Sequence, residues 1–233
     1  MKETDLKLHL GCGDKYLEGY LNIDFPQSEH SVMKVKADRY ADIATLHYPS
    51  GSIAEIRGHH VFEHFRRADA LRLLLEWRRW LKPHGVLHLE TPDFATSIFY
   101  YLFGGTKERY EISRHVFGSQ EAAWAFHGEG WNKEKYKFVL KKLGFGNLRF
   151  RKISNDLAKR FQVPALNIPG MFIPLPVYRK FGGKKLPNIT VFAERLPGEI
   201  DEKKAVREIL SRYLVGREGE AMLDVWMKDV FSS

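Results

Sequence analysis

Short apolar runs alternate with helical patterns along most of the chain. Three leucines alternate with polar residues over 6–10, which predicts a strand. Further strand-like runs lie at 20–24, 32–37, 52–58, 86–91, 147–153 and 189–194. Leucines recur at helical spacing over 65–81, and Lys82-Pro83-His84-Gly85 is a sequence that ends helices. Strands that alternate with helices predict an α/β fold in which a mostly parallel sheet is covered by helices.

The rest of the chain is less regular. The stretch from Asp93 to Trp131 is rich in aromatic residues and predicts no regular element. Asn132 has a side chain suited to a helix N-cap, and Gly144 suits the left-handed residue that ends a helix. From Glu199 on, apolar residues recur at a spacing that predicts two short helices.

The first strand leads into the turn Gly11-Cys12-Gly13, and the second strand ends on Asp24. This arrangement of strand, glycine turn, strand and acid is one that holds a nucleoside cofactor. The glycines let the backbone approach the ligand, and the acid accepts hydrogen bonds from the ribose hydroxyls. Two nearby glycines are also common in ordinary turns, so the motif gains weight only from the segments that follow it.

Composition narrows the class of protein. The 233 residues include one cysteine, Cys12, so no internal disulfide is expected and a reducing, cytoplasmic location is predicted. The charged N-terminus and the lack of a long apolar run predict neither a signal peptide nor a membrane span. The net charge of +8 is compatible with nucleic acid, anionic lipid or a phosphorylated substrate, and it does not choose among them.

Several short motifs follow one another at predicted element boundaries. In chain order they are Leu10-Gly11-Cys12-Gly13, Gly19-Tyr20-Leu21-Asn22-Ile23-Asp24, Asp42-Ile43-Ala44-Thr45-Leu46 with Tyr48-Pro49, His60-Val61-Phe62-Glu63-His64, Trp77-Arg78-Arg79-Trp80-Leu81-Lys82-Pro83-His84-Gly85, Pro92-Asp93, Phe117-Gly118-Ser119-Gln120 with Phe126-His127, and Lys142-Leu143-Gly144-Phe145. In order and wording they resemble the class I S-adenosylmethionine (SAM)-dependent methyltransferases. The match is to a bacterial, type-11-like subgroup associated with glycan and surface-polysaccharide genes, and it covers 6–153 and 188–195.

The resemblance implies a Rossmann-like, seven-stranded, mostly parallel sheet with an antiparallel seventh strand. Only residues 14–23 lie between the glycine turn and Asp24, whereas parallel strands usually need a dozen or more connecting residues. The first crossover helix is therefore expected to be reduced or absent, as it is in the subgroup. A methyltransferase domain is expected over 1–196, with a proline-rich insertion at 154–187, and a helical extension over 197–233.

The resemblance also implies SAM as the cofactor. Asp24 is expected to bind the ribose hydroxyls, and Asp42, with Asp38 as the alternative, is expected near the adenine amino group. Cys12 is predicted to be a packed side chain rather than a nucleophile. Gly11 and Gly13 are expected to contact the methionine part of the cofactor through their backbone, with Cys12 between them. The other candidates for cofactor binding are Leu10, Cys12, His59 and His60.

Methyl transfer needs an aligned nucleophile and often the removal of one proton. His127 follows the fifth strand, whose carboxyl end lies over the active face in this fold. It is the first candidate for a general base or acceptor-binding group, with Asp93 and His64 behind it. Glu63 is open to two interpretations, as a site residue or as an acid that matches the positive end of a helix. No metal is expected, and a zinc site of His59, His60, Glu63 and His64 is the alternative.

Together these features predict a SAM-dependent methyltransferase that acts on an oxygen of a sugar, glycan or lipid-linked intermediate. The alternatives are an RNA or small-molecule N-methyltransferase and a non-catalytic domain that binds SAM or a partner. Nucleic acid is not expected, because the sequence lacks the aromatic and basic motifs of known RNA-binding modules. The insertion is expected to overhang the site and to contact acceptor, membrane surface or partner through 165–185. The oligomeric state is not predicted.

Overall fold

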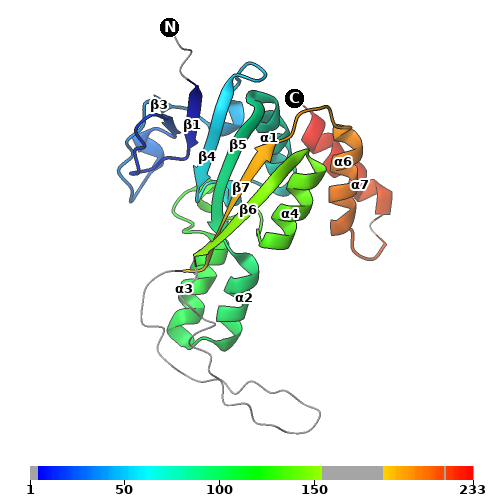
Figure 1. Cartoon of the computed structure of the whole chain (residues 1–233). Coiled ribbons are helices and arrows are strands. Elements are labelled where there is room, and N and C mark those ends of the chain that lie inside the picture. Colours follow the sequence, from blue (N-terminus) through cyan, green and yellow to red (C-terminus); the bar gives the residue numbers. More distant parts are fainter. Residues whose placement is uncertain (1–4, 154–185, 218, 233) are drawn as a thin grey trace.

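The computed structural model describes residues 5–153, 186–217 and 219–232, and these residues form one seven-stranded sheet with helices (Figure 1). The strands are β1 (Leu6–Leu10), β2 (Leu21–Asp24), β3 (Arg39–Tyr40), β4 (Ile53–His59), β5 (Leu81–Pro92), β6 (Phe145–Ile153) and β7 (Asn188–Arg195). Their order is β3-β2-β1-β4-β5-β7-β6. Strand β7 is antiparallel to β5 and β6, and the other neighbouring pairs are parallel. The predicted sheet and its antiparallel seventh strand are confirmed.

Four helices form a connected layer. They are α1 (Arg67–Trp80), α4 (Lys133–Lys142), α6 (Glu202–Leu210) and α7 (Gly219–Phe231). Helix α1 contacts α7, α7 contacts α6, and α6 contacts α4. Their buried apolar residues join those of the strands in a single core. The two predicted C-terminal helices are therefore part of the domain's core.

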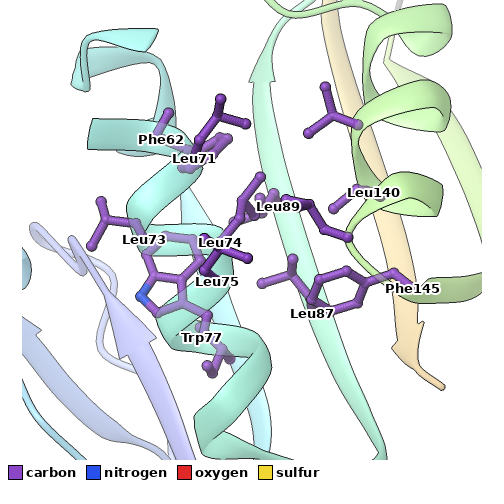
Figure 2. Packing of buried hydrophobic residues seen from close by; sticks show 14 of the residues in the cluster. Phe62, Leu71, Leu73, Leu74, Leu75, Trp77, Leu87, Leu89, Leu140 and Phe145 are labelled. Carbon is purple, nitrogen blue, oxygen red and sulfur yellow. The ribbon is translucent and has the colours of Figure 1, made fainter. Parts of the chain in front are cut away.

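The core is built mainly from leucines and aromatic residues. Figure 2 shows Leu74 and Trp77 of α1 near Leu87 and Leu89 of β5, with Leu140 of α4 across from them. All five of these residues are buried, with at most 2% of their surface exposed. The periodicity that predicted the helix over 65–81 therefore corresponds to the face that α1 buries. The helix ends at Trp80, and β5 begins at Leu81, several residues before the strand predicted at 86–91.

Residues 32–37 do not form the predicted third strand, which was wrong. The third strand is the exposed two-residue β3, paired to the end of β2. The side chain of Gln27 bonds to the backbone oxygen of Met33 and the backbone nitrogen of Val35. Those are backbone groups that a strand would use for its ladder. Val32 is 83% exposed, so its apolar side chain does not mark a buried strand face either.

The aromatic-rich stretch after β5 contains two helices that the sequence did not predict, α2 (Phe94–Phe103) and α3 (Thr106–Phe117). Figure 1 shows them as a hairpin that extends past the end of the sheet. The side chain of Asp93 accepts hydrogen bonds from the backbone and hydroxyl of Thr96 and so caps α2. Apolar residues lie all around α2, and many are exposed, so it lacks the one-sided stripe that identifies a helix.

The strands that flank the predicted insertion lie as expected. Strand β6 ends at Ile153 opposite Asn188, where β7 begins, and Asn188 also pairs with Pro92 at the end of β5. Nearly all of the 154–187 insertion, including the expected contact surface at 165–185, lies outside the described residues. Its role stays a prediction. Helix α4 is capped by Asn132 and followed by Gly144 at φ 75°, both as predicted.

Candidate active site

A cleft of about 540 Å³ opens at the carboxyl ends of β1, β2 and β4. Its volume is in the range of small-molecule and cofactor sites. Most of the predicted cofactor-binding residues line it, namely Gly11, Cys12, Gly13, Asp24, Asp42, His59 and His60. Leu10 is fully buried beneath the turn and is not part of the lining. Parallel strands end at a common edge, and this cleft is at the edge where this class of sheet binds ligands.

The glycine turn and Asp24 form one unit at the head of the cleft. Gly11 has φ 65°, and a Cβ there would lie 2.6 Å from the side chain of Val61. The backbone nitrogen of Gly13 donates to the Asp24 carboxylate at 2.6 Å, and that of Gly11 donates to Ile23 at 2.9 Å. The turn is therefore tied to the end of β2, which fixes the carboxylate beside the backbone that a ligand would approach.

Asn22 organises the short connection between β1 and β2. Its side-chain oxygen accepts from the Leu17 backbone and pairs with His9, while its nitrogen donates to the backbone oxygens of Leu17 and Tyr20. Residues 11–20 contain no helix, which confirms the expected loss of the first crossover helix. A buried side-chain amide thus satisfies backbone groups that a helix would have paired.

The two candidate acids for the adenine have different surroundings. Asp38 accepts from the backbone of Asn22 and from the Tyr16 hydroxyl, both at 2.8 Å, so it supports the same short connection. Asp42 lines the cleft and caps the short 3-10 helix η2 (Ile43–Thr45) through the backbone nitrogen of Ala44. Of the two, Asp42 is the one placed to face a ligand.

Cys12 has the environment of a structural thiol. It is 3% exposed, and its Sγ donates to the backbone oxygen of Lys36 at 3.4 Å. Burial, helped by the nearby negative charge of Asp24, raises the pKa of the thiol to about 12. A thiol of this kind is not a nucleophile near neutral pH, in agreement with its predicted packing role.

His59 and His60 leave β4 side by side but carry different charge. Burial, reinforced by the positive charge of Arg57, lowers the pKa of His59 to about 4. Desolvation acts on His60 in the same direction, but hydrogen bonds and charges from Glu63 and Glu90 outweigh it and raise its pKa to about 9. His59 is therefore neutral and His60 protonated near pH 7.

His60 adopts an unusual backbone conformation for a non-glycine residue, with φ 53°. Its backbone nitrogen donates to the oxygen of Glu90 at 2.9 Å, and its Nδ1 lies 3.1 Å from Oε1 of Glu63. This turn directs the chain from the end of β4 into the 3-10 helix η3 (Phe62–His64). The positively charged ring of His60 thereby forms an ion pair with the carboxylate of Glu63.

Glu63, His64 and His127 meet at the side of the cleft. One carboxylate oxygen of Glu63 and one ring nitrogen of each histidine lie within 4.8 Å of one another. The two imidazole rings are edge to face, with centroids 4.8 Å apart. His64 lines the cleft, whereas Glu63 and His127 are not part of its lining. Of the four residues considered for zinc, His59 and His60 are not part of this group.

His127 is held as a neutral imidazole. Burial lowers its pKa to about 4, so it has little tendency to take up a proton near neutral pH. Its Nδ1 lies 3.2 Å from the backbone oxygen of Val116, to which it donates as the neutral tautomer. Its predicted role as a general base stays a prediction. Asp93, another candidate for the general base, is 1% exposed. It caps α2 and does not line the cleft.

Two glycines bring His127 to His64. Gly118 has φ 88° and pairs with Phe126, so that the backbone nitrogen of His127 donates to Phe117. A Cβ on Gly128 would lie 2.8 Å from the backbone of Phe65. The backbone nitrogen of Gly128 donates to the backbone oxygen of Glu63. These close approaches fold the segment after α3 back onto η3.

We expect Gly118→Ala to destabilise the protein more than Gly198→Ala. Both glycines have positive φ, 88° and 99°, so both substitutions strain the backbone. A Cβ at 118 would also lie 2.1 Å from the oxygen of Ala125, whereas a Cβ at 198 meets nothing within 4 Å. The free energy of unfolding should fall by about 1–3 kcal/mol more for Gly118→Ala. Urea titration measures both variants, and equal losses would show that the close approach is not needed.

Sequence reasoning missed several residues of the cleft. Trp124 lines it, donates from Nε1 to the oxygen of Glu29 and lies 4.9 Å from the ring of His30. His30 in turn contacts Oδ1 of Asp24 at 3.2 Å. His9 also lines the cleft, from β1. Trp124 could have been predicted as a cleft residue only from its position after the fifth strand, because that region was expected over the active face.

Comparison with solved structures identifies the fold. A SAM-dependent methyltransferase from Archaeoglobus fulgidus is 15% identical, with a TM-score of 0.51 over 82% of this chain and 86% of that one. One from Methanosarcina mazei is 14% identical, with a TM-score of 0.49 over 85% and 95%. No protein-family model matches the sequence, and no curated protein matches it either. The chain has the fold of the class I SAM-dependent methyltransferases.

Among the described residues, no helix is both long enough and apolar enough to cross a membrane.

Proposed function

We propose that this protein is a SAM-dependent methyltransferase whose acceptor is an oxygen of a sugar, a glycan or a lipid-linked intermediate. The observation that carries the proposal is the cleft itself. The glycine turn, Asp24 and Asp42 line one cavity at the edge where this class of sheet binds its ligand. The class of acceptor follows from the resemblance to the glycan-associated subgroup.

The proposed cofactor makes use of groups that the cleft already presents. Asp24 accepts from Gly13, Phe25 and His30, and a carboxylate can accept about four hydrogen bonds. One ribose hydroxyl would donate to the remaining lone pair, and the other would replace His30. Asp42 would accept from the adenine amino group, and the ring of Trp124 offers an apolar surface on the cleft wall.

The reaction would be an in-line displacement. The acceptor oxygen attacks the methyl carbon of the sulfonium, the carbon–sulfur bond breaks, and S-adenosylhomocysteine leaves as a neutral thioether. The hydroxyl proton must be lost as the new carbon–oxygen bond forms. The protein's main contribution is to align the two reactants and to exclude competing water.

Titration calorimetry with S-adenosylhomocysteine tests the proposal. We expect one molecule to bind per chain. We expect no heat with NAD⁺, because residues 11–20 form no helix whose N-terminus could hold its pyrophosphate. Radiolabelled SAM then reports methyl transfer to candidate sugars and lipid-linked sugars. Absence of binding to S-adenosylhomocysteine would contradict the proposal. Binding without transfer to any acceptor would favour a non-catalytic, SAM-binding domain.

A further inference from the structure

We propose that Glu63, His64 and His127 bind a divalent transition-metal ion at the side of the cleft. Two imidazoles and one carboxylate form a ligand set that suits Zn²⁺, Fe²⁺, Mn²⁺ or Co²⁺ and leaves coordination positions open. The three side chains come from two segments that are separated in the sequence by α1, β5, α2 and α3. Their donor atoms nevertheless converge within 4.8 Å of one another.

The two histidines are oriented as metal ligands are. Nδ1 of His64 lies 3.2 Å from the backbone oxygen of Phe126, and Nδ1 of His127 lies 3.2 Å from that of Val116. Each ring must donate its Nδ1–H to that oxygen, because a carbonyl can only accept. Nε2 is therefore the ring nitrogen that each histidine keeps for a ligand. Histidines that bind metals almost always donate their other ring N–H to a carbonyl or carboxylate in this way.

Glu63 supplies a second, independent observation. Its side chain is 2% exposed, and its Oε1 is paired with His60. Its Oε2 is buried and has no hydrogen-bond partner. A buried carboxylate oxygen without a partner is costly, and the ion pair with His60 explains only one of the two oxygens. A cation bound between the carboxylate and the two imidazoles would satisfy the other oxygen.

The glycines of the returning segment add to the case. Gly128 packs against the backbone of Phe65 with no room for a side chain, and it donates to the oxygen of Glu63. The backbone next to His127 is thereby anchored to the backbone of Glu63 itself. The geometry of the three ligands is thus fixed by backbone contacts rather than by the side chains alone.

The position of the site suggests its use, and this part rests on the proposed function. His64 lines the cofactor cleft, so an ion on this group would lie within the space where cofactor and acceptor meet. Its open positions would bind an acceptor hydroxyl and lower the pKa of that hydroxyl. The proton would leave to water in the cleft, and the resulting alkoxide would take the methyl group as the carbon–sulfur bond breaks.

Cobalt spectroscopy on the tag-free protein tests metal binding without any substrate. We expect Co²⁺ to bind at one ion per chain and to give visible ligand-field absorption, which Zn²⁺ displaces. His64→Ala, His127→Ala and Glu63→Gln should each weaken binding at least tenfold. His84→Ala is the matched control, because this exposed histidine pairs with Glu194 away from the cleft, and it should bind Co²⁺ as the wild type does.

Melting curves and S-adenosylhomocysteine binding of each variant complete the design. His64 is only half-buried and Glu63→Gln keeps the shape of the side chain, so these two variants test the site even where His127→Ala unfolds. Wild-type protein without cobalt absorption, or unchanged affinity in His64→Ala and Glu63→Gln, would overturn the site. If the protein binds metal but not S-adenosylhomocysteine, the proposed function is contradicted and the proposed metal site still stands. Methyl transfer that persists in a chelator would overturn the role in acceptor binding.

Discussion

Replacing Asp24 with alanine should weaken the binding of S-adenosylhomocysteine at least tenfold. The carboxylate is the proposed acceptor of two ribose hydroxyls, and each hydrogen bond to a charged group contributes about 1.5–3 kcal/mol. The change also releases Gly13, whose backbone nitrogen donates to Asp24 at 2.6 Å, so the glycine turn loses its anchor. Calorimetry on wild type and variant measures the difference in affinity.

Glu18→Ala is the control for charge. Glu18 is an exposed acid of the same connection and does not line the cleft, so its loss should change the affinity by less than about twofold. Asp24→Asn keeps the shape of the side chain and one oxygen for Gly13, and should bind with an affinity between those of wild type and alanine variant. The same affinity in wild type and Asp24→Ala would remove Asp24 from the cofactor site.

Replacing Trp77 with alanine should lower the free energy of unfolding by about 3–5 kcal/mol, the usual cost of removing a large buried aromatic side chain. Trp77 is fully buried on the inner face of α1 (Figure 2). Its ring lies 5.5 Å from that of Phe62, which precedes Glu63 in η3. The loss should therefore also loosen the segment that presents Glu63 and His64. Urea unfolding followed by circular dichroism gives the change.

Trp77→Phe is the matched comparison. The indole nitrogen of Trp77 is buried without a hydrogen-bond partner. Phenylalanine therefore loses part of the packing but also removes an unsatisfied polar group. We expect a loss well below that of the alanine variant. Equal losses for the alanine and phenylalanine variants would show that an aromatic ring packed against Phe62 is not what stabilises this part of the core.

The sheet could be predicted because its strands alternate strongly and its connections carry clear end signals. Leu8 and Leu10 are fully buried, and the run that contains them is the observed β1. Helices α2 and α3 could not be recognised in the same way. Apolar residues surround α2, so the periodicity is lost, although Asp93 with Thr96 was a usable N-cap signal.

That the glycine turn and Asp24 lie together could also be predicted, because they are close in sequence and end two neighbouring strands. The group at Glu63, His64 and His127 was not. His127 was chosen from its place after the fifth strand, and its contact with His64 depends on the close approaches at Gly118 and Gly128. Such approaches are tertiary, and a single sequence carries no signal for them.

The lack of a helix between β1 and β2 changes how an anion can be held at the glycine turn. A helix N-terminus there would offer free N–H groups and a dipole equivalent to about half a positive charge. Residues 11–20 provide no such dipole. Lys15 lines the cleft beside the turn and is exposed. The carboxylate of the proposed cofactor would therefore be anchored by the solvated ammonium group of Lys15, and the affinity of the cofactor would fall as ionic strength rises.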